Sequence, residues 1–81
     1  MAIYGGMLKM NKLTYMQEIV LKCINKYYEE NGETPTLSEL CDMAGINTRS
    51  TVHEHLRNLQ KKGYIRVIPK LKRGIRFIND N

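Results

Sequence analysis

Residues 48–66, TRSTVHEHLRNLQKKGYIR, combine short hydrogen-bonding side chains, cations and an apolar stripe. On a helix with 3.6 residues per turn, Val52, Leu56 and Leu59 share one side, which we expect to face the core. The opposite side carries polar groups near the N-terminal end and cations toward the C-terminal end. Such a helix can place short polar groups against base edges in the major groove and cations against phosphates. The stretch therefore favours a surface that reads nucleic acid.

The outward side of this predicted helix supplies the candidate contacts. Its polar residues near the N-terminal end are candidates for reading bases, and its cations are candidates for the sugar-phosphate backbone. An ordinary solvated helix has the same kind of outward face, so this pattern alone leaves both interpretations open. The outward and flanking positions are Ser50, Thr51, His53, Glu54, Arg57 and Lys61, and Arg49 is a further candidate backbone contact.

The flanking sequence favours recognition over a plain solvated face. The segment LSELCDMAGINTRSTV has the order typical of a helix-turn-helix, with Ala44 and Gly45 at the turn and Ile46 as an apolar plug. After the helix, the basic connector PKLKR (69–73) supplies a second contact surface. The aromatic platform that single-strand and RNA binders need is missing.

Two further helices are expected before the turn. Thr14 with Gln17 has the form of a capping box, and apolar residues then recur at helical spacing from Met16 to Tyr27 until Asn31-Gly32 ends the helix. A second capping box, Thr36 with Glu39, begins a short helix. Its apolar stripe is Leu37, Leu40, Cys41 and Ala44.

The period changes after the third helix, which we expect to run from Thr48 to Lys62 and to end at Gly63. YIRVI (64–68) and GIRFI (74–78) read as strands, because Ile65, Val67, Ile75 and Phe77 alternate with Arg66 and Arg76. The predicted fold class is α+β, mainly α: a three-helix winged helix-turn-helix whose C-terminal two-stranded β-hairpin forms the wing. We expect a flexible leader at residues 1–12 and the DNA-binding domain at residues 13–79.

Charge is distributed unevenly along the 81 residues. The net charge is +5, but residues 1–47 hold four lysines and six acidic residues (−2), whereas residues 48–81 hold nine basic and two acidic residues (+7). A domain with one face on a polyanion would show this asymmetry, although chance clustering on a small surface would also produce it.

Other functional classes find little support. The sequence has no apolar run of membrane-spanning length and no signal-peptide pattern, so we expect a cytoplasmic protein without membrane contact. Cys23 and Cys41 fall on helix core positions without metal-ligand spacing, which predicts reduced buried thiols and no metal site. No acid, base or nucleophile constellation is present, so we expect no enzyme activity, no cofactor and no small-molecule substrate.

From Leu13 to Ile78 the chain resembles the N-terminal DNA-binding domain of the SOS-response repressor LexA. The matching motifs are LT..Q, G.TPT..EL, AGI, STVHEHL..L..KGYI and RGIRFI, and the STVHEHL form is most similar to LexA sequences of Gram-positive bacteria. The resemblance implies a sequence-specific repressor of transcription. It implies that Thr48, Ser50, Thr51, His53 and Glu54 approach bases, and that Lys62, Lys72 and Arg73 contact the DNA backbone.

Two departures from the family pattern change what the resemblance implies. Met16 stands where the family usually has a basic residue, so one backbone contact there is in doubt. The family's peptidase domain, which also holds most of the dimer contact, has no counterpart downstream of Ile78, so we expect no self-cleavage. We expect a weak or DNA-induced homodimer on a palindromic operator. The alternative is a winged-helix protein-interaction module that docks an acidic partner.

Three aromatic side chains have predicted roles outside recognition. We expect His55 to be a packed structural histidine, because it lies closer to the core side of the third helix than His53. Tyr27 and Tyr28, at the end of the first helix, are expected at the core and its rim.

Overall fold

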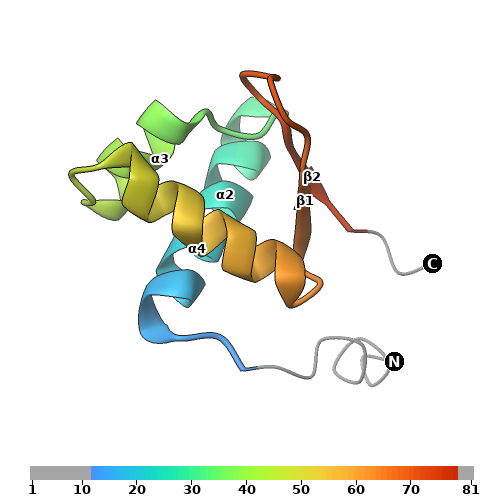
Figure 1. Ribbon diagram of the computed structural model, residues 1–81. Helices are drawn as coiled ribbons and strands as arrows, with labels where there is room; N and C mark the ends of the chain where they lie inside the picture. The colour runs from blue at the N-terminus through green and yellow to red at the C-terminus, as the bar shows by residue number, and fades with distance from the viewer. Residues whose placement is uncertain (1–11, 79–81) are drawn as a thin grey trace.

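The computed structural model describes residues 12–78, which form three helices followed by a two-stranded sheet (Figure 1). The helices are α2 (Tyr15–Asn31), α3 (Leu37–Ala44) and α4 (Arg49–Lys61), and the strands are β1 (Ile65–Val67) and β2 (Ile75–Phe77). This arrangement confirms the predicted mainly helical winged helix-turn-helix. Residues 1–11 of the predicted leader, and residue 79 of the predicted domain, lie outside the described residues.

The first two helices begin at the capping boxes that the sequence predicts. The Thr14 hydroxyl accepts the Gln17 N–H at 3.2 Å, and the Gln17 side chain accepts the Thr14 N–H at 3.1 Å. Thr36 and Glu39 exchange the same pair of bonds at 3.1 and 2.8 Å. Each exchange satisfies backbone donors that a helix N-terminus leaves without an intrahelical partner. Both helices end at a glycine in the left-handed region, Gly32 and Gly45.

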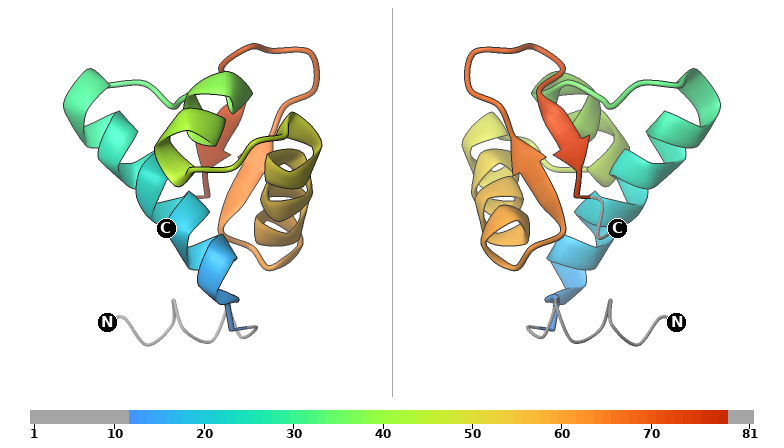
Figure 2. Two further views of the ribbon diagram at one scale, coloured as in Figure 1. Left: turned by 90° about the vertical axis from the view of Figure 1, so that its left-hand side faces the viewer. Right: turned by 90° about the vertical axis from the view of Figure 1, so that its right-hand side faces the viewer.

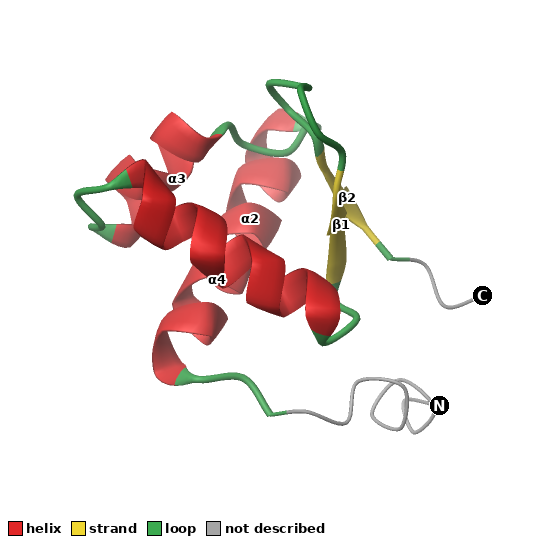
Figure 3. Ribbon diagram, viewed as in Figure 1, coloured by secondary structure: helices red, strands yellow, loops and turns green. Residues whose placement is uncertain are grey.

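The core lies where α2, α3 and α4 meet and where β1 packs on α4 (Figures 1 and 3). Val52, Leu56 and Leu59 are buried, which confirms the inward side predicted for α4. α4 is one residue shorter at each end than predicted, because Thr48 is its N-cap and Lys62 its C-cap. The other buried apolar side chains are Val20, Ile24, Leu40, Ile65 and Ile75.

The hairpin is antiparallel, with Ile65 opposite Phe77 and Val67 opposite Ile75. Its strands are shorter than the predicted five-residue segments. Ile65 and Ile75 are buried, whereas 37% of the surface of Phe77 remains exposed. Phe77 lies at the core's rim, where its ring packs edge-on against Tyr28 with the ring centres 5.2 Å apart.

The loop that joins the strands, residues 68–74, is called the wing loop below. It lies at the same end of the molecule as the loop between α2 and α3 (Figure 2). The hairpin therefore brings its basic loop close to the helix-turn-helix. None of the helices within residues 12–78 is both long and apolar enough to span a lipid bilayer.

Candidate nucleic-acid interface

α4 presents its predicted reading side to solvent. The Thr48 hydroxyl accepts the Thr51 N–H at 3.4 Å and donates to the Thr51 hydroxyl at 2.7 Å, which orders the first turn. A hollow of about 360 Å³ lies over the first turns of α4, where they face Leu37 of α3. The exposed residues of this face are Thr48, Arg49, Ser50, Thr51, His53, Glu54, Arg57 and Lys61.

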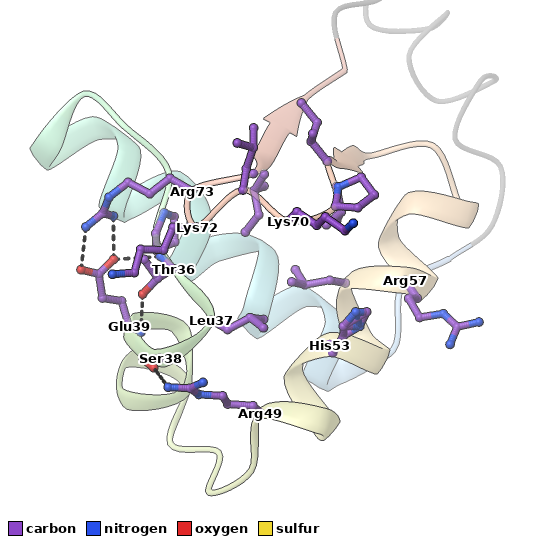
Figure 4. Close-up of a pocket in the computed structure, with 18 of the residues that line it drawn as sticks. Thr36, Leu37, Ser38, Glu39, Arg49, His53, Arg57, Lys70, Lys72 and Arg73 are labelled. Carbon is purple, nitrogen blue, oxygen red and sulfur yellow. Dashed lines mark hydrogen bonds and ion pairs between the residues drawn. The ribbon is translucent and has the colours of Figure 1, made fainter.

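A groove of about 610 Å³ separates α4 from the wing loop and the start of α3 (Figure 4). We call it the α4–wing groove. Cations and one imidazole lie along it on both sides: Arg49, His53 and Arg57 from α4, and Lys70 and Lys72 from the wing loop. The predicted reading side and the basic wing thus border one concave surface.

Local backbone geometry fixes the shape of the wing loop. The Ile68 N–H donates to the Gly74 carbonyl at 2.9 Å and closes the loop. At Gly74 a Cβ atom would lie 2.5 Å from the Ile68 carbonyl oxygen, so only glycine fits. Lys70 has φ 69°, a left-handed conformation that follows Pro69 and leaves the Lys70 side chain exposed. Sequence reasoning did not select Lys70, although the basic connector PKLKR contains the signal.

Two of the residues predicted to contact the DNA backbone, Arg49 and Lys62, also make hydrogen bonds between helices of the domain. Arg49 Nη2 of α4 donates to the Ser38 hydroxyl of α3 at 2.6 Å. Lys62 Nζ donates to Gln17 Oε1 at 2.7 Å and to the Lys12 carbonyl at 2.8 Å, so the end of α4 is fixed to the start of α2. Each cation keeps donors for another acceptor, since a guanidinium has five N–H groups and an ammonium three.

The remaining lysines and arginines of the interface have fewer internal contacts. Within residues 12–78, Arg57, Lys61, Lys70 and Lys72 form no ion pair or hydrogen bond through their side chains. All four are exposed. They are the cations that a polyanion can reach without displacing another partner.

Arg73 differs from these cations because Glu39 of α3 binds it. Arg73 Nη1 lies 2.7 Å from Glu39 Oε1, and Nη2 lies 3.0 Å from Oε2. The hydrogen bond from Arg73, together with the backbone N–H of the capping box, lowers the pKa of Glu39 to about 2. The same pairing raises the pKa of Arg73. Sequence reasoning missed this pair, because 34 residues separate its members.

The three aromatic residues that were expected to have structural roles do not lie on the exposed face of α4. His55 is half-buried, as predicted, and its buried Nδ1 has no hydrogen-bond partner among residues 12–78. Tyr27 is half-buried and donates to Glu39 at 3.2 Å, whereas Tyr28 is exposed at the rim.

The two cysteines are free, but they are half-buried where the sequence predicted buried thiols. Each packs at the margin of the core, which leaves part of the side chain uncovered. Burial raises the pKa of Cys23. In the part of the chain that the structure describes, His, Cys, Asp and Glu form no cluster of three that could hold a metal ion.

Comparison with known proteins gives a consistent match. Residues 10–74 match the family model for the LexA DNA binding domain. The LexA repressor of Caldicellulosiruptor saccharolyticus is 43% identical over 70 residues, which cover 86% of this chain and 35% of that repressor. The LexA repressor of Bacillus mycoides is 40% identical over 72 residues, covering 89% and 35% of the two chains. The chain therefore spans about a third of the length of the curated relatives it matches.

Proposed function

Because the chain belongs to the LexA DNA-binding domain family, we propose that it binds double-stranded DNA sequence-specifically and acts as a LexA-like repressor of transcription. The exposed polar face of α4, beside the α4–wing groove and its cations, is the observation that carries this proposal. Sequence-specific recognition requires side chains that reach base edges and cations that fix the protein on the backbone. We propose no catalytic role.

In this proposal α4 enters the major groove with its N-terminal turns. Ser50, Thr51, His53 and Glu54 are short or planar polar side chains, and they are exposed over those turns. They can donate to or accept from base edges, which present a different pattern of groups for each base pair. Thr48 is the N-cap of α4, and it is proposed to approach the bases from that end of the helix. These five residues are the proposed base readers.

The phosphate contacts are proposed for the cations around that face. Arg57, Lys61, Lys70 and Lys72 have no competing partner within residues 12–78, and Arg49 and Lys62 keep unused donors. If five or six of them neutralise phosphates, the logarithm of the binding constant should fall against the logarithm of the salt concentration with a slope of about −5. A slope near zero would exclude a phosphate-dominated interface.

We further propose that two copies bind one palindromic operator and pair through DNA. One copy offers five proposed base readers, and a second copy would double that number. Helix-turn-helix proteins commonly bind in this way, with two copies on half-sites about one helical turn apart. Sedimentation without DNA should give the mass of one chain, and titration into a palindromic duplex should saturate at two chains per duplex. Saturation at one chain per palindrome would exclude the paired arrangement.

The same cations would also attract an acidic protein, so the test of function has to separate the two partners. Fluorescence anisotropy of a labelled duplex, selected from a random pool, is measured with two competitors. We expect unlabelled duplex to displace the label at stoichiometric excess and polyglutamate to leave it bound at equal charge concentration. Equal displacement by polyglutamate would favour an acidic protein partner and contradict duplex recognition.

A further inference from the structure

The side chain of Arg73 is surrounded by acceptors from α2, α3 and the loop between them. Besides the two bonds to Glu39, Arg73 Nη1 donates to the Thr34 carbonyl at 3.0 Å and to the Tyr27 hydroxyl at 3.3 Å. Nε lies 3.5 Å from a carboxylate oxygen of Glu33. Figure 4 shows Arg73 and Glu39 joined by two bonds at the end of the α4–wing groove where α3 begins.

These partners leave Arg73 little capacity to bind a phosphate. All three guanidinium nitrogens already face acceptors of the domain. Two carboxylates, Glu33 and Glu39, pair with the one guanidinium of Arg73. A phosphate brought to this position would meet these two carboxylates and would compete with a bidentate pair, which is among the stronger hydrogen-bonded arrangements in proteins.

The pair also joins the wing loop to α3. Among the helices of residues 12–78, α4 is the one whose backbone runs close to a strand, through β1. Arg73 is part of the wing loop, and Glu39 is in the first turn of α3. β1, which leads into the wing loop, packs on α4, and the Arg73–Glu39 bonds fix the other end of the loop to α3. The Arg76 side chain adds a bond to the Arg73 carbonyl at 2.7 Å.

The Glu39 carboxylate is also fixed by hydrogen bonds to partners other than Arg73. Its Oε1 accepts the Thr36 N–H at 2.8 Å as part of the capping box, and its Oε2 accepts the Tyr27 hydroxyl at 3.2 Å. One carboxylate thus begins α3 and anchors the wing. A carboxylate fixed in this way holds Arg73 without first having to lose its own conformational freedom.

We propose that Glu39 and Arg73 are positioning residues for DNA binding, which hold the wing loop against α3 so that Lys70 and Lys72 are pre-arranged for the DNA backbone. This inference rests on the proposed function. Lys72 is next to Arg73 in the sequence, and Lys70 precedes Arg73 by three residues. If Arg73 were released, the backbone at both lysines would therefore become more mobile. If the loop became ordered only on binding, the affinity would be lower, because the loop would then lose conformational entropy during association.

The replacement Glu39→Gln tests the positioning role, because this role and the simple loss of a negative charge predict opposite changes in DNA affinity. Glutamine keeps the capping box, since either side chain can accept the N-cap N–H, but it loses the ion pair. Removal of an acid near a polyanion should strengthen binding by simple electrostatics. The positioning role predicts instead that binding weakens, by roughly 3- to 10-fold. Glu30→Gln, which removes an acid paired with Lys26 on α2, is the matched control and should leave binding unchanged or slightly tighter.

Arg73→Lys is the second variant, and it keeps the test open if Glu39→Gln fails to fold. Lysine retains the positive charge but cannot make the bidentate contact. The 81-residue chain is titrated into a labelled duplex at several salt concentrations, and amide hydrogen exchange of residues 69–74 is measured without DNA. We expect weaker binding, an unchanged salt slope and faster exchange in the wing loop for both variants.

Other outcomes separate the two hypotheses. Wild-type protein that does not bind duplex DNA would contradict the proposed function itself. Wild-type binding together with unchanged or tighter binding by Glu39→Gln and Arg73→Lys would overturn the positioning role alone. A third variant, Arg73→Gln, removes the positive charge. If it reduced the salt slope by about one while Glu39→Gln bound like wild type, Arg73 would be a direct phosphate contact, and the positioning role would be overturned.

Discussion

Thr34 and Ile75 are 41 residues apart, yet the Thr34 hydroxyl donates a hydrogen bond of 2.9 Å to the Ile75 carbonyl. Thr34 is 6% exposed and lies in the loop between α2 and α3, whereas Ile75 begins β2. The bond joins the helical part of the domain to the hairpin inside the molecule. The nearby Arg73–Glu39 pair makes the same connection closer to the surface.

Replacing Thr34 by Val should reduce the free energy of unfolding by about 1–2 kcal/mol, because a buried carbonyl loses one of its donors. The loss should stay within this range, since Arg76 Nη1 also donates to the Ile75 carbonyl, at 3.0 Å. Thr34→Ser keeps the hydroxyl and should retain more of the stability. Urea denaturation of the three proteins measures this, and a Val variant as stable as wild type would show that the bond contributes nothing.

Gly74→Ala should distort the wing loop and weaken DNA binding. The added Cβ would lie 2.5 Å from the Ile68 carbonyl oxygen, which belongs to the backbone and cannot move without shifting the loop. Gly32→Ala is the matched control. It strains the left-handed end of α2, by about 1 kcal/mol, in open space, and Gly32 does not line the α4–wing groove. We expect anisotropy titrations to show weaker binding for Gly74→Ala and unchanged binding for Gly32→Ala.

The free energy of unfolding should depend on pH through Glu39. Its pKa is about 2 in the folded domain, below the ordinary value of 4.5, so folding favours the ionised form. This contribution is present in full above about pH 4.5 and is lost as the pH falls through about 2. Between these values, wild type should lose more stability than Glu39→Gln. Parallel unfolding curves for the two proteins would contradict the prediction.

Changes on the reading face should alter which bases are preferred. Ser50→Ala or Glu54→Ala should cost on the order of 1–3 kcal/mol of binding at the matched base pair and less at a mismatched one. Lys72→Ala should instead weaken binding to all sequences alike and reduce the salt slope by about one. Binding to a panel of duplexes with single base-pair changes distinguishes the two patterns. Uniform weakening by Ser50→Ala and Glu54→Ala would mean that α4 only positions the domain.

Much of the fold was predictable because its signals are local. The capping boxes of Thr14 and Thr36 lie within three residues of their partners, and the left-handed ends of α2 and α3 fall on glycines. The apolar period of α4 identified its buried side correctly. The partial exposure of Phe77 was not predictable in this way, because alternation gives the face of a strand but not where the core ends.

The candidate site was predictable in its residue types and less so in its contacts. Exposure of the α4 polar face follows from the helical period alone. Which cations remain available does not, because Arg73 with Glu39 and Lys62 with Gln17 meet only after the chain has folded. Nothing within a few residues of Arg73 distinguishes it from Lys72, so sequence reasoning gave both the same role.

Sequence-specific recognition of duplex DNA can be measured by selecting bound sequences from a random duplex pool. The most enriched duplex and a scrambled duplex of equal length and composition are then titrated at one fixed salt concentration near the physiological value. We predict a palindromic enriched sequence, bound on the order of 10³-fold or more tightly than the scrambled duplex. A pool without enrichment, or equal affinity for the two duplexes, would contradict sequence-specific recognition by this domain.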